Sequence, residues 1–405
     1  MNLLQEGIAN QSVIKTKLNK QLRIDGRTDT YEVYEIKLDC LYYNDQNDRI
    51  ATWISKYKSD NHVDMIDMSD LDAYNSIIEG FVVASNPDAM RKTKNNIRAI
   101  GQQEYGVVLT DGRIIDGNRR FTCLRQIQRE TGTTQYFKAV ILPHDIEHNA
   151  KQIKMLELSL QLGVDKPVDY DPVDKLVGLY HAVAETHLIT VEEYATHTSS
   201  TPKRVIADLE KAKLMIEYLE FINASGSYHL IKELNLYYPI EELYKMLKGF
   251  NDYDDRKEDI KSIVFANFTV QPEGDMTRYI RKIKKIVESP RFVNGFIDEQ
   301  MPLTEEVVDV IDRQEQVNEQ VLNQQLTNSE LSEQFFDSTE KWRTKSQSDE
   351  TRNRPAFLLD KACSNVEAID TNIFLKMTDE QLGVVSDKLN KLSALIEQIQ
   401  GELDA

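Results

Sequence analysis

Two arginines stand side by side after an Asp-Gly-Asn sequence, within the stretch GVVLTDGRIIDGNRRFTCLRQIQ. The residues before them have strand-like character and those after them have helical spacing, so Arg119 and Arg120 fall in the first turn of a helix. Two cations there repel each other and oppose the helix dipole, unless an anion lies between them. Gly117 and Asn118 would bring backbone N–H groups close to that anion. Because arginine donors match phosphate oxygens, the pattern predicts a phosphate site.

A second interpretation of the same residues stays open, in which Arg119 and Arg120 pair with acids such as Asp111 or Asp116. Asp116 itself is either a metal ligand or an arginine-orienting group, or else a plain turn carboxylate. The net charge of −18 argues against a nucleic-acid-binding surface that covers the whole protein. Residues 91–129, however, hold 9 basic and 3 acidic side chains, so a local anion site is compatible with the composition.

The elements around the arginines predict a small mixed α/β domain over roughly residues 30–145. Alternating apolar residues and an Asp-Gly turn signal predict strands, whereas apolar residues at helical spacing and N-cap signals predict helices. The expected elements are a strand at 31–43, helices at 67–81 and 86–100, a hairpin at 106–116, a helix from 118 and a strand at 135–143.

After residue 145 the chain is almost wholly helical. A short helix with a capping box, Thr190 and Glu193, precedes a longer helix capped by Thr201, which is the layout of a helix-turn-helix. Thr201, Lys203 and Arg204 lie at the end of the second helix that contacts bases in such motifs, so they are candidate DNA-binding residues. The window 186–222 holds 4 basic and 6 acidic residues, which keeps a packing or protein-contact role open.

The C-terminal part of the chain is acidic, with 21 acidic and 10 basic residues over 300–405. Residues 225–312 are expected to be helical, and residues 313–372 to form an acidic, polar, loosely packed connection. The last segment, 373–405, has an unbroken heptad pattern that predicts a coiled coil. Its apolar positions are Leu382, Val385, Leu389, Leu392, Ile396, Ile399 and Leu403.

The segment GVVLTDGRIIDGNRRFTCLRQI resembles the core of the ParB/sulfiredoxin superfamily. Partition proteins of this superfamily carry a Gly-Glu-Arg-Arg box between a strand and a helix, and the matching box here runs from Gly117 to Arg120. The segments LELSLQLG, YDPVDKLVGLYHAVAE and ITVEEYATHTSSTPKRVIADLEKAKLM follow in the order of the family's downstream helices and helix-turn-helix. The resemblance covers roughly residues 30–222.

The resemblance implies an α+β fold: a small mixed α/β ParB/sulfiredoxin-like domain, 1–148, followed by mostly α-helical domains. A helix-turn-helix domain, 149–224, would follow it. Gly117, Asn118, Arg119 and Arg120 would bind a nucleoside triphosphate, CTP or ATP. Glu157 would match the acid that holds Mg²⁺, with Glu157 and Asp116 as the catalytic candidates of a possible NTPase. The resemblance also implies a homodimer, through the N-terminal domain and the coiled coil, in which nucleotide controls dimer closure or DNA binding.

Departures from the family pattern keep two other functions open. Asn118 replaces the Glu of the box, and Leu158 and Gln161 stand where Asn and Arg are expected. One alternative is a phosphotransferase or nuclease of the same fold, in phage defence or a mobile element. The other is an adaptor that does not use nucleotide.

Several other classes of protein are disfavoured by the sequence. No apolar run is long enough for a membrane span, and the N-terminus lacks the pattern of a secretory signal. Three widely spaced cysteines favour a reducing cytoplasm, and Cys123 is expected to be a core residue. His144 and His148 have a spacing that permits a metal site on one helical face, although the signature of a metalloprotease is missing.

Overall fold

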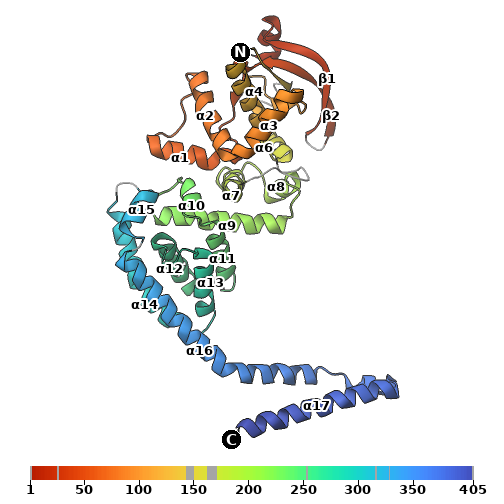
Figure 1. Ribbon diagram of the computed structural model, residues 1–405, viewed down its shortest axis with the longest axis vertical. Helices are drawn as coiled ribbons and strands as arrows, with labels where there is room; N and C mark the ends of the chain where they lie inside the picture. Colours follow the sequence, from red (N-terminus) through yellow and green to blue (C-terminus); the bar gives the residue numbers. More distant parts are fainter. Residues whose placement is uncertain are drawn as a thin grey trace. The chain divides into compact units, whose positions relative to one another are not determined.

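The computed structural model describes residues 2–24, 27–142, 150–161, 171–251, 254–314, 317–327 and 329–403 (Figure 1). The chain divides into two compact units, Met1–Arg343 and Thr344–Ala405. The first unit begins with a six-stranded mixed sheet and continues with helices, so its class is α+β. Among the described residues, no helix combines the length and the apolarity needed to cross a membrane.

The strand order of the sheet is β1-β2-β6-β4-β5-β3. Strands β4 and β6 are parallel, as are β3 and β5, and the remaining neighbours are antiparallel. The strands are β1 (Val13–Ile24), β2 (Arg27–Lys37), β3 (Tyr42–Tyr43), β4 (Gly106–Val108), β5 (Arg113–Asp116) and β6 (Tyr136–Ile141).

Alternation along the strands gives the sheet two buried faces, because successive side chains of a strand point to opposite sides. Ile114 of β5 belongs to the core shared with helices α2 to α4, whereas Ile115 belongs to the core shared with α6. Val107 and Val108 of β4 divide in the same way. The helices that complete these cores are α1 (Ala51–Asn61), α2 (Leu71–Ser85), α3 (Pro87–Ile100), α4 (Asn118–Thr131) and α6 (Ala150–Gln161).

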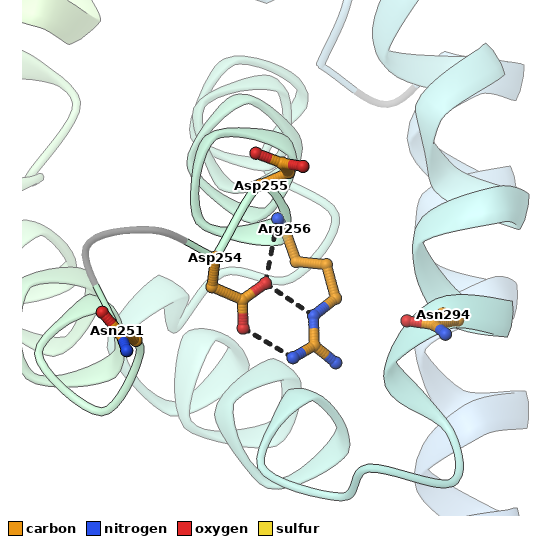
Figure 2. Close-up of a pocket in the computed structure, with 5 residues that line it drawn as sticks. All are labelled: Asn251, Asp254, Asp255, Arg256 and Asn294. Atoms are coloured by element: carbon orange, nitrogen blue, oxygen red, sulfur yellow. Dashed lines mark hydrogen bonds and ion pairs between the residues drawn. The ribbon is translucent and has the colours of Figure 1, made fainter.

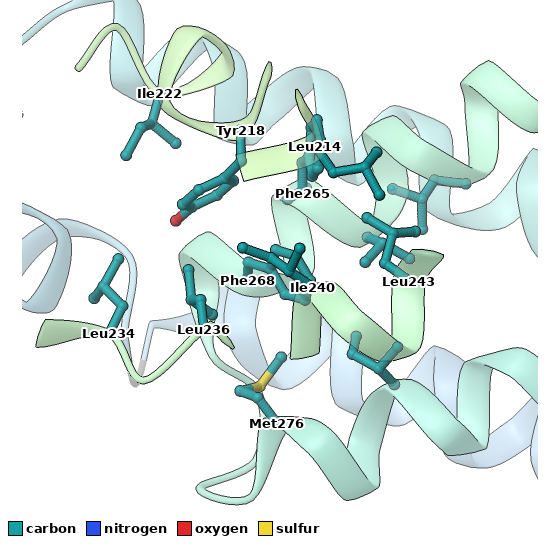
Figure 3. Close-up of a cluster of buried hydrophobic side chains, with 14 of the residues drawn as sticks. Leu214, Tyr218, Ile222, Leu234, Leu236, Ile240, Leu243, Phe265, Phe268 and Met276 are labelled. Atoms are coloured by element: carbon teal, nitrogen blue, oxygen red, sulfur yellow. The ribbon is translucent and has the colours of Figure 1, made fainter. Parts of the chain in front are cut away.

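The rest of the first unit is a helical assembly around one large core, part of which is drawn in Figure 3. Tyr218 of α9, Leu243 of α11 and Phe268 of α12 are fully buried in it. The helices of the large core are α7 (Pro172–Leu179), α9 (Pro202–Phe221), α10 (His229–Glu233), α11 (Tyr237–Leu247), α12 (Arg256–Val270), α13 (Met276–Val287), α14 (Val293–Asp312) and α15 (Glu319–Gln325). A smaller core lies between α6, α8 (Val191–His197), α9 and the π-helical continuation of α7, η4 (Tyr180–Glu185).

Three short helical segments precede or follow these elements: η1 (Leu3–Gly7), η2 (Leu38–Cys40) and η3 (Asp48–Ile50) in the α/β part. The long helix α16 (Glu330–Glu367) begins in the first unit, where Phe335 is fully buried, and continues into the second. The second unit also contains η5 (Thr371–Lys376) and α17 (Asp379–Leu403), none of whose side chains is buried.

Several sequence-based expectations are confirmed by these elements. The hairpin before the arginines, the helix from 118 and the following strand are all present. Asn86 caps α3 with Pro87 as its first residue, and Thr190 and Glu193 form the expected capping box. These features were predictable because caps and tight turns depend on local chemistry.

Other expectations were incomplete or wrong. Strand β1 lies in a segment for which no element was predicted, and only Val13 and Leu22 of this edge strand are buried, so its sequence lacks an alternating pattern. The strand expected at 31–43 ends at Lys37. Residues 313–372, expected to form an acidic, polar connection, include helices α15 and α16. Helices α7 and α9 contribute to the same core as the helices that follow residue 224.

Candidate phosphate-binding site

The loop between β5 and α4 takes a backbone conformation that favours glycine. Gly117 has a φ of 107°, and a Cβ there would lie 2.8 Å from Cζ of Phe137. Gly117 is also the N-cap of α4 and has no side chain to satisfy the first N–H groups of the helix. The start of α4 therefore presents N–H groups and the positive end of a helix dipole, which together favour a bound anion.

This helix start opens into a pocket of about 970 Å³. All four residues of the box, Gly117 to Arg120, line it, together with Asp116. The pocket walls come from β1, η3, the end of α2, α3, the end of β5, the start of α4 and the end of α6. Five cationic and two acidic side chains line it: Lys20, Arg49, Lys92, Arg119, Arg120, Glu104 and Asp116. This excess of positive charge suits a polyanionic ligand.

Arg120 pairs with Asp116, as the alternative interpretation of the sequence predicted for this residue. Nη2 of Arg120 donates a hydrogen bond of 2.8 Å to Oδ2 of Asp116, and Nζ of Lys20 lies 3.9 Å from the same oxygen. Burial lowers the pKa of Lys20, and the charge of Asp116 opposes this effect. Asp116 therefore orients Arg120 at the pocket wall, with two cations around one carboxylate.

The other cations of the basic window 91–129 are mostly used to hold helices together. Arg125 and Arg129 of α4 bind Glu79 of α2, which lies outside the window. Lys94 and Arg98 of α3 both bind Glu130. Of the basic residues that α3 contributes, Lys92 is the one that lines the pocket. The local charge excess in the sequence is thus largely structural, and only part of it reaches the pocket.

Asn118 is the buried polar residue of the box. Its side chain lines the pocket, the residue is only 9% exposed, and within the described chain its Oδ1 has no hydrogen-bond partner. A buried amide oxygen without a partner costs about 1–3 kcal/mol. Because this oxygen is almost completely buried, it is not exposed to a ligand in the pocket.

Glu157 lies behind the pocket wall, not in the pocket. One of its carboxylate oxygens accepts a hydrogen bond of 3.1 Å from Gln161, and the other lies 3.6 Å from Nζ of Lys154. Lys154 also binds both carboxylate oxygens of Asp48 at 2.8 Å. The ammonium group thus supplies the positive charge that a metal ion was expected to supply to Glu157.

The buried cluster of Asp48, Lys154 and Glu157 holds one cation and two acids, so one acid lacks a full counter-charge. Lys154 lies closer to Asp48 than to Glu157. Glu157 is therefore the less well compensated acid, and its pKa is the one that is raised. Burial raises the pKa of Glu157 to about 7, an effect that Lys154 reduces and Asp48 reinforces. Helix α7 packs directly on this cluster, because a Cβ at Gly178 would lie 2.3 Å from Cγ of Asp48.

The described residues do not offer a preformed metal site. Within the described ranges, no group of three His, Cys, Asp or Glu side chains could hold a metal ion. His144 and His148 lie outside the described residues. Cys123 is fully buried in the core, where burial raises the pKa of its thiol to about 11, as expected for a core residue rather than a nucleophile.

The helix-turn-helix candidates are separate from this pocket. Thr201 caps α9, and Thr201, Lys203 and Arg204 are all exposed at its start. Helix α8 packs against α9, as does α7. The structure thus leaves the three predicted DNA-binding residues accessible, and their DNA contacts remain a prediction.

A second polar pocket, of about 620 Å³, lies beside the start of α12 and is shown in Figure 2. Its arginine is already engaged, because Arg256 binds both carboxylate oxygens of Asp254 at 2.7 and 2.5 Å. Figure 2 shows the carboxylate of Asp255 directed away from this pair. The pocket therefore has no excess of either charge comparable to that around Arg119.

The sequence did not identify Lys20 or Arg49 as site residues. Lys20 lies on β1, which has no sequence signal of its own, and Arg49 lies on η3, within a segment that indicated only a turn. Lys92 belongs to the basic window 91–129, but nothing in the sequence indicates that it lines a pocket while the other basic residues of the same helix do not. Only the folded chain brings these three cations to the start of α4.

No protein-family model matches the chain, and a search of curated proteins found no match.

Proposed function

We propose that the pocket at the start of α4 binds the phosphates of a nucleoside triphosphate, CTP or ATP, and that this binding controls DNA binding by the α8–α9 helix-turn-helix. The observation that carries the proposal is the uncapped start of α4, placed behind Gly117 in a pocket with five cationic side chains. Arg119 and Arg120 would grip phosphate oxygens, with backbone N–H groups at Gly117 and Asn118. We also propose that the chain belongs to the ParB/sulfiredoxin superfamily, which its sequence resembles.

The phosphate part of the proposed ligand fits the described residues better than the metal part. Gly117, whose positive φ favours glycine, places no side chain over the first N–H groups of α4. Glu157, in contrast, already has Lys154 and Gln161 on its two oxygens. Glu157 therefore has no free oxygen for Mg²⁺ in this arrangement, and a comparison of nucleotide binding with and without Mg²⁺ would test whether the metal contributes.

The proposed function predicts that nucleotide will stabilise the protein against heat. We expect a thermal shift with at least one of CTP, ATP, ADP, GTP and UTP, measured with and without Mg²⁺. A ligand at a hundred times its dissociation constant adds about 2.7 kcal/mol of stability. The identity of the active nucleotide would separate a CTP-dependent switch from an ATP- or ADP-using enzyme. The absence of any shift would contradict nucleotide binding.

A specific observation also supports the adaptor as a second candidate function. Arg120 is already hydrogen-bonded to Asp116, so part of its charge is balanced without a ligand. In an adaptor the same loop would be stabilised by these internal contacts alone. If none of the five nucleotides changes the melting temperature of the protein, the result would fit this second candidate.

The proposed assembly is a cytoplasmic homodimer, formed in part through α17. Its apolar heptad positions have no covering layer in the described chain, and Leu389, Ile396 and Ile399 are each more than 40% exposed. A single amphipathic helix has little stability in water without packing on its apolar face. A second copy of α17 would cover that face as a coiled coil. The three free cysteines fit a reducing compartment.

We expect Leu389→Glu together with Ile396→Glu to dissociate the nucleotide-free dimer, because two charges would enter the apolar seam. Sedimentation velocity on the full-length chain would measure the change. Val384→Glu is the matched control, since Val384 is 56% exposed but lies off the heptad seam. Unchanged sedimentation of the double variant would contradict pairing through α17.

A further inference from the structure

Helices α7 and α11 pack against α9 (Figure 1). A groove of about 540 Å³ is lined by side chains of these three helices. Arg204, Asp208 and Lys211 line it at intervals of four and three residues, which places them on one helical face. Lys175 reaches it from α7, and Lys245 and Tyr237 reach it from α11. The groove begins at the same exposed end of α9 that carries the DNA-binding candidates.

The charges in this α9 groove are not balanced. Asp208 is 9% exposed, and its two carboxylate oxygens bind different lysines, Lys211 at 2.6 Å and Lys175 at 3.2 Å. Burial works against ionisation of Asp208, but the two lysines outweigh it and the pKa of the carboxyl is lowered. Arg204 adds a third cation at the rim, whereas Lys245 is balanced by Glu241 and Glu242. Three cations therefore surround one ionised carboxylate.

Folding separates this positive groove from Glu210 and Glu217, two other acids of the same sequence window. Glu210 pairs with Lys213 on another face of α9, and Glu217 pairs with Lys261 of α12. Lys175, in contrast, comes from outside the window and joins the groove. A count along the chain from 186 to 222 thus underestimates the positive charge beside the start of α9.

We propose that the α9 groove binds a phosphate group, supplied by the DNA backbone that passes the start of α9. Arg204 offers forked donors, Lys175 and Lys211 offer ammonium donors, and all three converge on one opening. A phosphate contact of this kind would fix the register of α9 on the duplex, while its exposed first turn faces the bases. This inference rests on the DNA-binding part of the proposed function, and it is independent of the nucleotide pocket.

The sharpest test compares two lysines that lie two positions apart on α9. Lys211→Gln removes a groove cation and leaves Asp208 with Lys175, whereas Lys213→Gln removes the same charge from another face. Binding of the full-length chain to a duplex of about 30 base pairs would be measured over a range of salt concentrations, because each phosphate contact adds about 0.9 to the salt slope. We expect Lys211→Gln to weaken binding roughly tenfold and to reduce the slope, with little effect of Lys213→Gln. Equal effects of the two variants would overturn the backbone contact.

A second measurement separates DNA from a free phosphate ligand. In the Arg119→Ala/Arg120→Ala background, which removes the first pocket's arginines, pyrophosphate would be titrated by thermal shift with and without Lys211→Gln or Lys213→Gln. Suppose that Lys211→Gln abolishes the pyrophosphate shift, that Lys213→Gln does not, and that Lys211→Gln leaves DNA binding unchanged. The groove would then bind a free phosphate ligand, and the proposal that the phosphate belongs to DNA would be overturned. If the wild-type chain binds no duplex, the DNA-binding function fails, and the groove is judged by pyrophosphate alone. No lysine-specific effect in either measurement would overturn the groove as a phosphate site.

Discussion

Replacing Arg119 and Arg120 together by alanine is expected to abolish nucleotide binding while leaving the fold intact. Both residues line the pocket at the uncapped start of α4, and each would make charge-assisted hydrogen bonds to phosphate. Such bonds contribute about 1.5–3 kcal/mol each, so the dissociation constant should rise at least about a hundredfold. Isothermal titration calorimetry with the nucleotide that gives the largest thermal shift would measure the loss.

The matched control for this experiment removes two cations that lie outside the pocket. Lys94 and Arg98 both bind Glu130 on the surface between α3 and α4, so Lys94→Ala with Arg98→Ala changes the net charge equally. We expect nucleotide affinity close to that of the wild type in the control. Retained binding in the Arg119/Arg120 variant, or an equal loss in the control, would contradict the site.

Glu157→Gln is expected to stabilise the protein at alkaline pH and to have little effect at acidic pH. The folded-state pKa of Glu157 is raised by burial to about 7, from an ordinary value of 4.5. A raised pKa means that the folded state favours the protonated acid, so its contribution to stability is present below pH 4.5 and lost as the pH rises through 7. Glutamine removes this loss and can still accept the hydrogen bond from Gln161. The expected gain above pH 8 is about 3 kcal/mol.

Urea unfolding at pH 5 and pH 8.5 would measure this difference. Lys154→Ala provides the opposite test, because it leaves Asp48 and Glu157 buried without their common cation. That change should destabilise the fold by about 3–5 kcal/mol at neutral pH. If Glu157 instead holds Mg²⁺, millimolar Mg²⁺ should stabilise the wild type and not Glu157→Gln. A glutamine variant that is less stable than the wild type at pH 8.5 would contradict the buried-acid account.

The arginine variant and the Glu157 variant change different parts of the pocket at the start of α4: the first changes its lining, and the second changes the buried cluster behind it. Gln161 lines the pocket at the start of α4 and also hydrogen-bonds to Glu157, so the buried acid lies one residue behind the pocket. A change in Arg119 and Arg120 should alter ligand binding with little effect on unfolding. A change at Glu157 should alter unfolding, and it should affect the ligand only through Gln161.

The local features of the site could be predicted from the sequence alone. An Asp-Gly turn, a glycine before a helix and two arginines in its first turn are short-range signals, and the structure has the hairpin, the loop and α4 in these places. The caps of α3, α8 and α9 were predictable for the same reason. The heptad pattern of α17 likewise required only spacing along one helix.

The partners of the charged residues could not be predicted, because a charge shows its partner only after the chain has folded. Arg125 and Arg129 seemed part of a positive window, yet they bind Glu79 from a helix some fifty residues earlier. Glu157 seemed a candidate metal ligand, yet Asp48 and Lys154 make it part of a buried ionic cluster. The sequence shows each of these residues but not the distances between them.

The loop, the helix start and the two arginines that define the candidate site could all be predicted from short stretches of the sequence. The tertiary structure decided which other cations reach it, since Lys20, Arg49 and Lys92 come from three distant segments. It also decided that Lys175 joins Arg204 and Lys211 beside α9. The physical reason is the range of the interactions: turns, caps and helical periodicity depend on a few neighbouring residues, whereas a pocket's charge depends on side chains that only packing brings together.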